Sequence, residues 1–356
     1  MRMKMNKFQN IVIQRSVATK NLGNIKWMLP RSFASLWMTL ICAFFTACST
    51  TKNLPEGEIL YTGIDKLEVV NEDKTLAGVT ALTEVEAALA YAPNNAILGS
   101  SSLRWPIPFG LWVYNGFEKY QDKKGVGRWI FDHLGKSPVL MSSVNGETRA
   151  KVATNLLRDY GYFNGSVSYQ EVPQKNPKEA KVSYVIDMAQ PYFLDSIAYL
   201  RYPHYADSLI RSTHSQSVLK SGENFSVLKL EEERQRLSSL FRNHGYYYYR
   251  PEFTTYRADT LQKPGYVSLQ VVPRNGVPTE ARKQYYIGKT SVYLTGYNDE
   301  PPTDTLRLRT MDIYYNGKKP GIRPSALMRN FFFRKGELFS QDRQTFTQEA
   351  IARMGV

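Results

Sequence analysis

The sequence has few of the residues from which covalent, metal or nucleophilic sites are usually built. Of its 356 residues, two are cysteines and four are histidines. Both cysteines, Cys42 and Cys48, lie in the first 48 residues, so the rest of the chain can form neither a disulfide nor a cysteine-based metal site. The histidines are scattered, and there is no P-loop, no Gly-x-Ser-x-Gly and no Gly-x-Gly-x-x-Gly segment. We therefore expect no enzyme, no metal and no cofactor.

Acidic residues are absent from residues 1–47, which hold seven of the 46 basic residues. Residues 48–356 therefore carry 39 basic and 32 acidic residues, so the net charge of +14 falls to +7 in that part of the chain. No block of lysine and arginine remains there. The charge therefore gives no reason to expect nucleic acid as a partner.

Long hydrophobic runs are also scarce. The run Leu36–Phe45 has ten residues, which is too short to cross a hydrocarbon core of about 30 Å as a helix. Basic residues precede it and Ala47-Cys48 follows it, an order typical of a bacterial lipoprotein signal peptide. We predict that residues 1–47 are such a signal. The alternatives are an ordinary secretory signal with a chance cysteine, or a short buried helix.

The predicted lipid attachment site is Cys48, followed by a short polar tether over 48–57. An acylated cysteine of this kind would anchor the protein at the periplasmic face of the outer membrane. The segment before the apolar run is unusually long for a signal, and a start at Met28 would give a conventional length.

An internal repeat runs through the remaining chain. The segment Gly222-Glu223-Asn224-Phe225-Ser226 recurs as Gly336-Glu337-Leu338-Phe339-Ser340, and a helical pattern follows each copy. A third helical pattern of the same type lies upstream. The three patterns run into Gly161, Gly245 and Gly355, and glycine is favoured just after a helix.

Each repeat is predicted to run strand, helix, helix, strand, strand. The expected fold is therefore α+β, with a three-stranded sheet and two helices on one of its faces in every unit. The first unit is placed at 58–190 with an insertion at about 92–140, the second at 191–276 and the third at 283–356. The third is expected to stop after its second helix, before its last two strands.

Apolar spacing also predicts which helix faces are buried. The predicted faces consist of Val152, Leu156 and Tyr160; of Val227, Leu230, Leu237 and Phe241; and of Phe346, Ala350 and Met354. Glu231–Glu233 are predicted to begin the polar side of the second helix. Tyr247–Tyr256 is predicted as a strand.

A βααββ repeat in an exported chain resembles the POTRA domain. After Cys48, the segments Lys52–Glu58, Leu60–Ile64, Asn94–Ser102 and Pro108–Trp112 resemble the lipoprotein-anchored members of the BamA/TamA outer-membrane assembly family. The resemblance implies a periplasmic region that binds unfolded outer-membrane proteins or a periplasm-spanning partner subunit. Family members continue into a membrane-embedded barrel, so we expect this sequence to be a fragment.

The resemblance implies that the strand after the second helix forms a sheet edge, to which an extended peptide can add. The expected partner-binding residues are Ser166, Val167, Ser168 and Tyr169 in the first unit, and Phe253, Thr254, Thr255 and Tyr256 in the second. The alternative is that both strands are covered and their tyrosines only pack across the sheet. A periplasmic lipoprotein that binds cell-wall polymer, or serves as a structural scaffold, is the competing function.

The insertion holds a dense apolar stretch that includes Trp105, Phe109 and Trp112. These three form a candidate docking cluster for a partner or for the membrane near the lipid anchor. The alternative is a small satellite core packed on the first unit.

Overall fold

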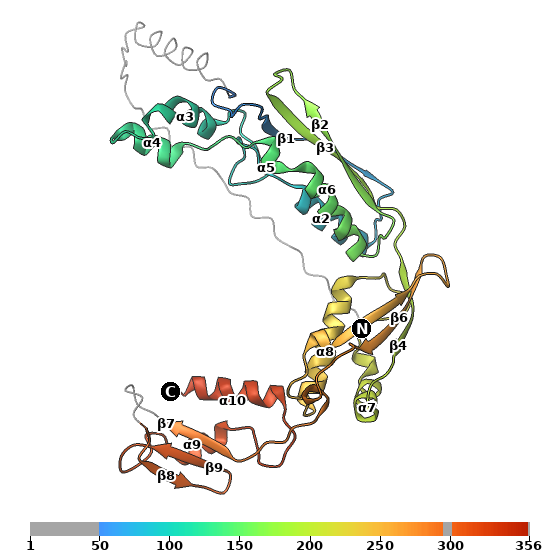
Figure 1. Cartoon of the computed structure of the whole chain (residues 1–356), viewed down its shortest axis with the longest axis vertical. Coiled ribbons are helices and arrows are strands. Elements are labelled where there is room, and N and C mark those ends of the chain that lie inside the picture. The colour runs from blue at the N-terminus through green and yellow to red at the C-terminus, as the bar shows by residue number, and fades with distance from the viewer. Residues whose placement is uncertain (1–49, 295–300, 355–356) are drawn as a thin grey trace, which may run out of the picture.

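A computed structural model of the protein describes residues 50–294 and 301–354. The predicted signal segment and Cys48 lie outside these residues. The described part forms three successive α+β units that follow one another along a curved arc (Figure 1). Each unit has its own three-stranded sheet and its own hydrophobic core. The predicted fold class is therefore confirmed.

The first unit has a sheet in the order β1-β3-β2. Strand β1 is parallel to the central β3, whereas β2 is antiparallel to it. Helices α2 and α6 lie side by side on one face of this sheet (Figure 1). The elements of this unit outside the insertion are β1 (Leu60–Val70), α2 (Leu76–Leu89), α5 (Met141–Val144), α6 (Gly146–Asp159), β2 (Ser166–Pro173) and β3 (Glu179–Asp187).

The predicted insertion contains α3 (Phe109–Phe117), a 3₁₀ turn at Glu118–Tyr120 and α4 (Val126–Leu134). It packs on the start of β1 through Arg104, whose guanidinium lies where a Cβ at Gly63 would stand. Gly63 has φ = 121°, at a point where the register of β1 shifts against β3. The backbone conformation therefore favours glycine at this position, and a methyl group there would displace the end of the Arg104 side chain.

The second unit repeats this topology with the sheet order β4-β6-β5. Again the first strand is parallel to the central one and the outer strand after the helices is antiparallel. Its elements are β4 (Phe193–Tyr199), α7 (His204–Ser212), α8 (Val227–Asn243), β5 (Thr254–Asp259) and β6 (Tyr266–Pro273). Strand β5 is shorter than the sequence predicts, because Tyr247 and Tyr248 form a turn and Pro251–Phe253 form a 3₁₀ turn.

The third unit differs from its prediction. Its sheet has three strands in the order β7-β9-β8, and the hairpin β8–β9 lies before the helices rather than after them. Strand β9 is parallel to β7, the position that β3 and β6 hold in the other units. Its elements are β7 (Thr290–Leu294), β8 (Asp304–Arg307), β9 (Met311–Tyr315), α9 (Pro324–Asn330) and α10 (Gln341–Arg353).

The predicted helix faces are partly wrong. In α6 the buried face consists of Ala150, Ala153 and Leu157, and Val152 is exposed. Small residues face inward because α6 packs closely against α2. In α10 Phe346 is exposed and Thr347 is buried. In α8 Leu237 and Phe241 are buried as predicted, whereas Val227 is exposed.

Glu233 of α8 is a further correction. It lies at 0% exposure rather than on the polar side of the helix. Its carboxylate accepts hydrogen bonds from Tyr199 at 2.6 Å, from the Val218 backbone at 3.2 Å and from both Nε and Nη2 of Arg236 at 2.9 and 2.6 Å. A buried charge is stable only with such partners, and these donors replace the water that it loses.

Candidate functional site

Strand β2 is an open sheet edge. It pairs with β3 on one side only, and nearly all of its side chains are exposed. The N–H of Val167 donates to Thr154 Oγ1 at 2.9 Å, so this group points away from β3. Because backbone direction alternates along an antiparallel strand, Tyr169 and Glu171 also turn their N–H and C=O groups outward. No described residue forms a hydrogen bond with these two outward N–H groups.

Strand β5 presents a second open edge. The N–H of Arg274 donates to the carbonyl of Phe253 at 2.7 Å, so the backbone carbonyl of Phe253 points toward the β6 side of the strand. The same alternation turns Tyr256 and Ala258 outward. Thr254, also predicted as a partner-binding residue, is 1% exposed and its N–H already donates to the carbonyl of Pro251, so it offers no free group to the edge. Phe253, predicted as an edge-strand residue, lies in the 3₁₀ turn before β5 and takes no part in the outer edge.

The opposite edges of these two sheets are partly covered by the chain itself. Beside β4, the N–H of Leu194 donates to the carbonyl of Glu223 at 2.8 Å, and that of Phe225 donates to the carbonyl of Tyr192 at 2.8 Å. Beside β1, the N–H of Tyr61 donates to the carbonyl of Val139 at 2.8 Å. The first residues of both parallel strands are therefore already paired, whereas β2 and β5 retain unpaired backbone groups.

The side chains on β5 reach the helix layer below. Tyr256 donates its hydroxyl to the carbonyl of Leu230 at 2.5 Å, and the Arg234 guanidinium lies 5.5 Å from the centre of its ring. Burial raises the pKa of Tyr256, and the Glu233 charge adds to this effect. The side chain of Tyr256 is therefore already engaged with helix α8. A partner could reach β5 only at its outer backbone edge.

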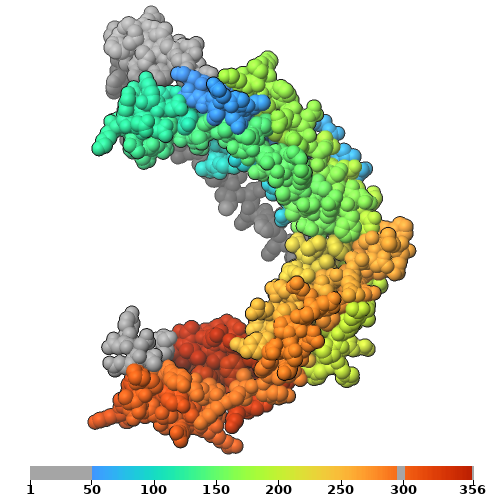
Figure 2. Space-filling view, viewed as in Figure 1, coloured from blue at the N-terminus to red at the C-terminus, as the bar shows by residue number. Residues whose placement is uncertain are grey.

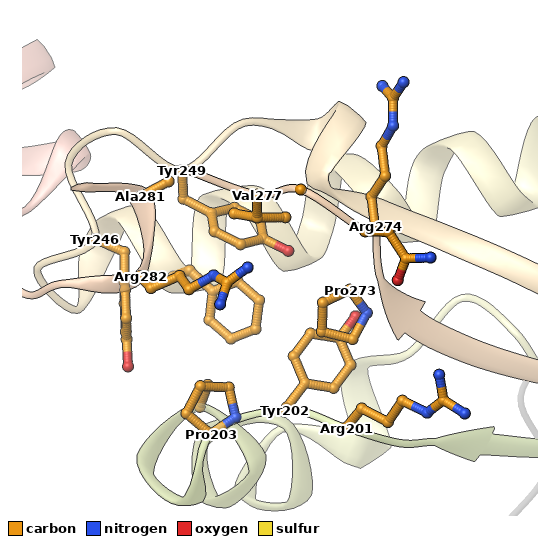
Figure 3. Close-up of a pocket in the computed structure, with 14 residues that line it drawn as sticks. Arg201, Tyr202, Pro203, Tyr246, Tyr249, Pro273, Arg274, Val277, Ala281 and Arg282 are labelled. Atoms are coloured by element: carbon orange, nitrogen blue, oxygen red, sulfur yellow. The ribbon is translucent and has the colours of Figure 1, made fainter. Parts of the chain in front are cut away.

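A cavity of about 300 Å³ lies at the end of the second sheet where β4 and β6 finish (Figure 3). Aromatic rings form its floor: Tyr202, Phe241, Tyr246 and Tyr249. Burial raises the pKa of Tyr249 to about 12, so its hydroxyl stays neutral and shares a hydrogen bond of 2.9 Å with Thr254 Oγ1. An apolar group of a ligand would find a preformed surface here.

Three exposed arginines line this cavity: Arg201, Arg274 and Arg282. None of them forms an ion pair with any residue that the structure describes. Arg201 has φ = 66°, a left-handed conformation that costs roughly 1 kcal/mol outside glycine. Uncompensated guanidinium groups around an aromatic floor favour a ligand that combines negative charge with an apolar group.

The candidate docking cluster lies in the insertion. Trp105 and Phe109 are each 62% exposed, and Trp112 is half-buried on α3. All three line a single apolar groove together with residues from α4. The fold therefore places all three residues on one surface, and two of the three are exposed to solvent.

The chain enters the first unit beside this insertion. Asn115 on α3 donates to the carbonyl of Thr50 at 3.2 Å, and Asn53 donates to the carbonyl of Asn115 at 3.3 Å. The hydroxyl of Thr50 donates to Glu179 at 2.5 Å. The predicted lipid attachment site, Cys48, lies outside the described residues, two positions before Thr50.

Two features of the second unit were missed by sequence reasoning. The arginines of the cavity come from two connections, Arg201 from the one after β4 and both Arg274 and Arg282 from the one after β6, and no sequence motif connects them. Glu233 stands in the acidic run Glu231–Glu233, which has the pattern of a solvated helix face. Among the described residues, no helix is long and apolar enough to span a bilayer, and no group of three potential metal ligands converges.

No known protein-family profile matches the sequence, and no curated protein sequence matches it. Solved structures similar to the chain include POTRA domains 3–5 of BamA from Haemophilus influenzae, with 10% identity, a TM-score of 0.35, and coverage of 85% of this chain and 89% of that one. POTRA domains 1–3 of Omp85 from Anabaena have 11% identity, a TM-score of 0.27 and coverage of 85% and 87%. The N-terminal domain of Omp85 from Thermosynechococcus elongatus has 14% identity, a TM-score of 0.24 and coverage of 85% and 88%.

Proposed function

We propose that the protein is the periplasmic region of an outer-membrane protein assembly factor of the BamA/TamA type, held at the outer membrane by a lipid on Cys48. Its βααββ units bind extended segments of unfolded outer-membrane proteins, or of a partner subunit, by strand addition. The domain limits are those expected from the repeat: 58–190, 191–276 and 283–356.

One observation carries this proposal. In both the first and the second unit, the outer strand after the helices keeps unpaired backbone groups, while the start of the opposite edge is covered. Exposed sheet edges promote aggregation, and proteins usually protect them. Two open edges in successive units therefore favour a function in which these edges bind a partner strand. In strand addition the affinity comes from main-chain hydrogen bonds, so a domain that binds in this way can accept segments of many different sequences.

The cavity beside β5 adds a second contact. It lies at the end of the sheet where β5 begins, since Tyr249 and Pro273 both line it. A peptide with an acidic or apolar group near the end of its paired segment would meet the aromatic floor and the arginines. Binding would then combine backbone pairing with charge complementarity.

The test uses two adjacent proline substitutions on β5. Ala258→Pro removes an outward N–H and leaves the pairing with β6 intact, whereas Arg257→Pro removes an N–H that faces β6. We expect Ala258→Pro to leave the unfolding midpoint almost unchanged and to weaken binding of an unfolded outer-membrane protein peptide by about tenfold. Arg257→Pro is the control that should lower stability.

The same logic applies to β2, where Glu171→Pro removes an outward N–H and Gln170→Pro an inward one. Binding that survives both Ala258→Pro and Glu171→Pro would contradict strand addition. Binding of cell-wall glycan by the same protein, with no peptide binding, would favour the competing cell-wall function.

A further inference from the structure

The insertion presents an exposed apolar surface, made by side chains of α4 and of residues 98–109. We call it the aromatic surface, and its members are Leu98, Trp105, Phe109, Val126, Trp129 and Leu134. The side chains of all six are exposed to solvent, with exposed fractions of 75% for Val126 and 56% for Trp129. Four of them also line an apolar groove of about 870 Å³ between α4 and residues 94–112. Apolar surface on this scale indicates an interaction site.

Tryptophan is confined to this part of the mature chain. The sequence has five tryptophans, of which Trp27 and Trp37 lie in the presequence and the other three are Trp105, Trp112 and Trp129. Tryptophan combines a large apolar ring with a polar N–H, so it is favoured where an apolar phase meets water. Its concentration in one insertion, and its absence from residues 130–356, point to an interface of that kind.

Helix α4 is amphipathic but has no buried residue. Its apolar residues Val126, Trp129 and Leu134 are exposed, and its polar residues Arg128 and Asp132 form an ion pair of 3.3 Å. Ile130 and Phe131 are half-buried, and the ring of Phe131 lies 5.2 Å from that of Tyr114 on α3. A helix with this distribution is typical of one that lies in the plane of a membrane surface.

The charge of the insertion agrees with an anionic surface. Residues 92–140 hold six basic residues and three acidic ones, a net charge of +3. The basic side chains are Arg104, Lys119, Lys123, Lys124, Arg128 and Lys136. Lys136 also lines the apolar groove. Lysine and arginine beside exposed aromatic rings complement anionic lipid headgroups.

The path of the chain brings this surface close to the predicted anchor. Thr50 is bonded to Asn115 on α3, the helix that also carries Phe109 and Trp112. Two residues of chain span at most about 7 Å, so a lipid on Cys48 would insert beside α3. Figure 2 shows the insertion at one end of the arc, next to the first described residues. An anchored surface needs little affinity of its own, because its effective concentration at the membrane is high.

We propose that the aromatic surface docks on the phospholipid bilayer, with its tryptophan rings at the level of the headgroups. This inference rests on the lipid anchor of the proposed function. Docking would hold the first unit flat against the membrane by two contacts, the lipid and the insertion. The second and third units would then extend from the membrane in a fixed direction.

The test uses the mature chain, residues 48–356 with Cys48→Ser, so that no lipid assists binding. Vesicles of phosphatidylethanolamine and phosphatidylglycerol are added, and the intrinsic tryptophan fluorescence is followed together with co-sedimentation. Because all three tryptophans of this chain lie in the insertion, the signal reports on that region alone. We expect a shift of the emission to shorter wavelength and co-sedimentation that increases with the fraction of anionic lipid.

Val126→Glu and Phe109→Glu should each weaken vesicle binding by about tenfold while keeping every tryptophan. The matched control is Leu261→Glu, which replaces a side chain that is 91% exposed in the second unit. Equal binding by the parent chain, Val126→Glu and Leu261→Glu would overturn the proposal. So would self-association that Val126→Glu abolishes without vesicles, because the surface would then bind a second copy.

Mass spectrometry of the protein from cell membranes separates this inference from the anchor itself. Acylated Cys48 together with no vesicle binding would overturn the docking surface and leave the anchor standing. Vesicle binding together with unmodified Cys48 would support the docking surface and contradict the anchor.

Discussion

The carbonyl oxygen of Gly161 accepts a hydrogen bond of 2.9 Å from the N–H of Tyr192, and this bond joins the first unit to the second. Tyr192 in turn accepts from the N–H of Phe225 at 2.8 Å, and the ring of Phe163 packs at 5.0 Å on that of Phe225. The glycine that ends one helix pair is therefore bound to the next unit.

The same joint recurs between the second and third units. Gly245 accepts from the N–H of Tyr285 at 2.8 Å, and Tyr285 accepts from that of Phe339 at 2.9 Å. The ring of Tyr247 lies 4.7 Å from that of Phe339, in the place where Phe163 packs on Phe225 in the first joint. The repeated Gly-Glu-x-Phe-Ser segment is thus half of a joint, and the glycine-aromatic segment of the preceding unit is the other half.

We expect Gly161→Ala to weaken the first joint. Gly161 has φ = 91°, and a Cβ there would lie 2.6 Å from the carbonyl oxygen of Phe225. The matched control is Gly222→Ala, which has φ = 85° but nothing within 4 Å of the new methyl group. Both changes carry about 1–2 kcal/mol of backbone strain. Only Gly161→Ala should also broaden the distribution of molecular dimensions in small-angle X-ray scattering. Identical scattering for the two variants would contradict the role of the joint.

Replacing Glu233 by glutamine should strongly destabilise the second unit. The change leaves Arg236, only 16% exposed, without its charge partner. Breaking one side of a buried ion pair costs about 3–5 kcal/mol. Glu232→Gln on the exposed side of the same helix should change the free energy of unfolding by less than about 0.5 kcal/mol. Urea unfolding of both variants measures the difference, and equal midpoints would show that the buried network contributes little.

Acid should weaken the first unit through Asp73. Partial burial works against its charge, but hydrogen bonds from Tyr162, at 2.6 Å, and from Thr75 outweigh this and lower the pKa of Asp73. A lowered folded-state pKa adds stability above the unfolded value, about 3.9, and this stability is lost as the pH falls through the folded value. We expect Asp73→Asn to flatten that part of the pH profile of the unfolding midpoint. Parallel profiles for parent and variant between about pH 5 and pH 2 would refute this.

The arginine-lined cavity should discriminate by charge. Arg282→Glu places a carboxylate beside the aromatic floor and should weaken binding of an acidic, aromatic peptide by about tenfold. Arg250→Glu changes the net charge equally at an exposed residue outside the lining of the cavity. Titration calorimetry at two salt concentrations compares them. An equal loss for both variants would mean that overall charge, and not the cavity, attracts the peptide.

The order of elements in the first two units could be predicted because it depends on local patterns. Alternating strands and glycines at helix ends depend on short stretches of sequence, and the strand–helix–helix–strand–strand order of both units agrees with the prediction. The buried faces of α6 and α10 were harder to predict, because they contain alanine and threonine, which are small or polar and do not stand out in a hydrophobic pattern. These residues are nevertheless the ones that the packing of the helices buries.

Non-local features could not be predicted in this way. Both halves of each joint are visible as motifs, but their contact brings together residues far apart in the chain, such as Gly161 and Phe225. The third sheet was missed because β8 and β9 are only four and five residues long and lie where the other units have no strand. The edges at β2 and β5 were anticipated from a family resemblance, whereas the covering of β1 and β4 is visible only in the fold.

The two joints also have a geometric meaning. Each is made by the same backbone groups in the same order, so the two successive units are attached to their predecessors in the same way. The arc in Figure 1 is thus held at both joints by main-chain hydrogen bonds that recur, with a glycine and a pair of aromatic rings beside each of them. Substitutions on the surfaces of the units, away from the joints, should therefore leave the bonding of one unit to the next unchanged.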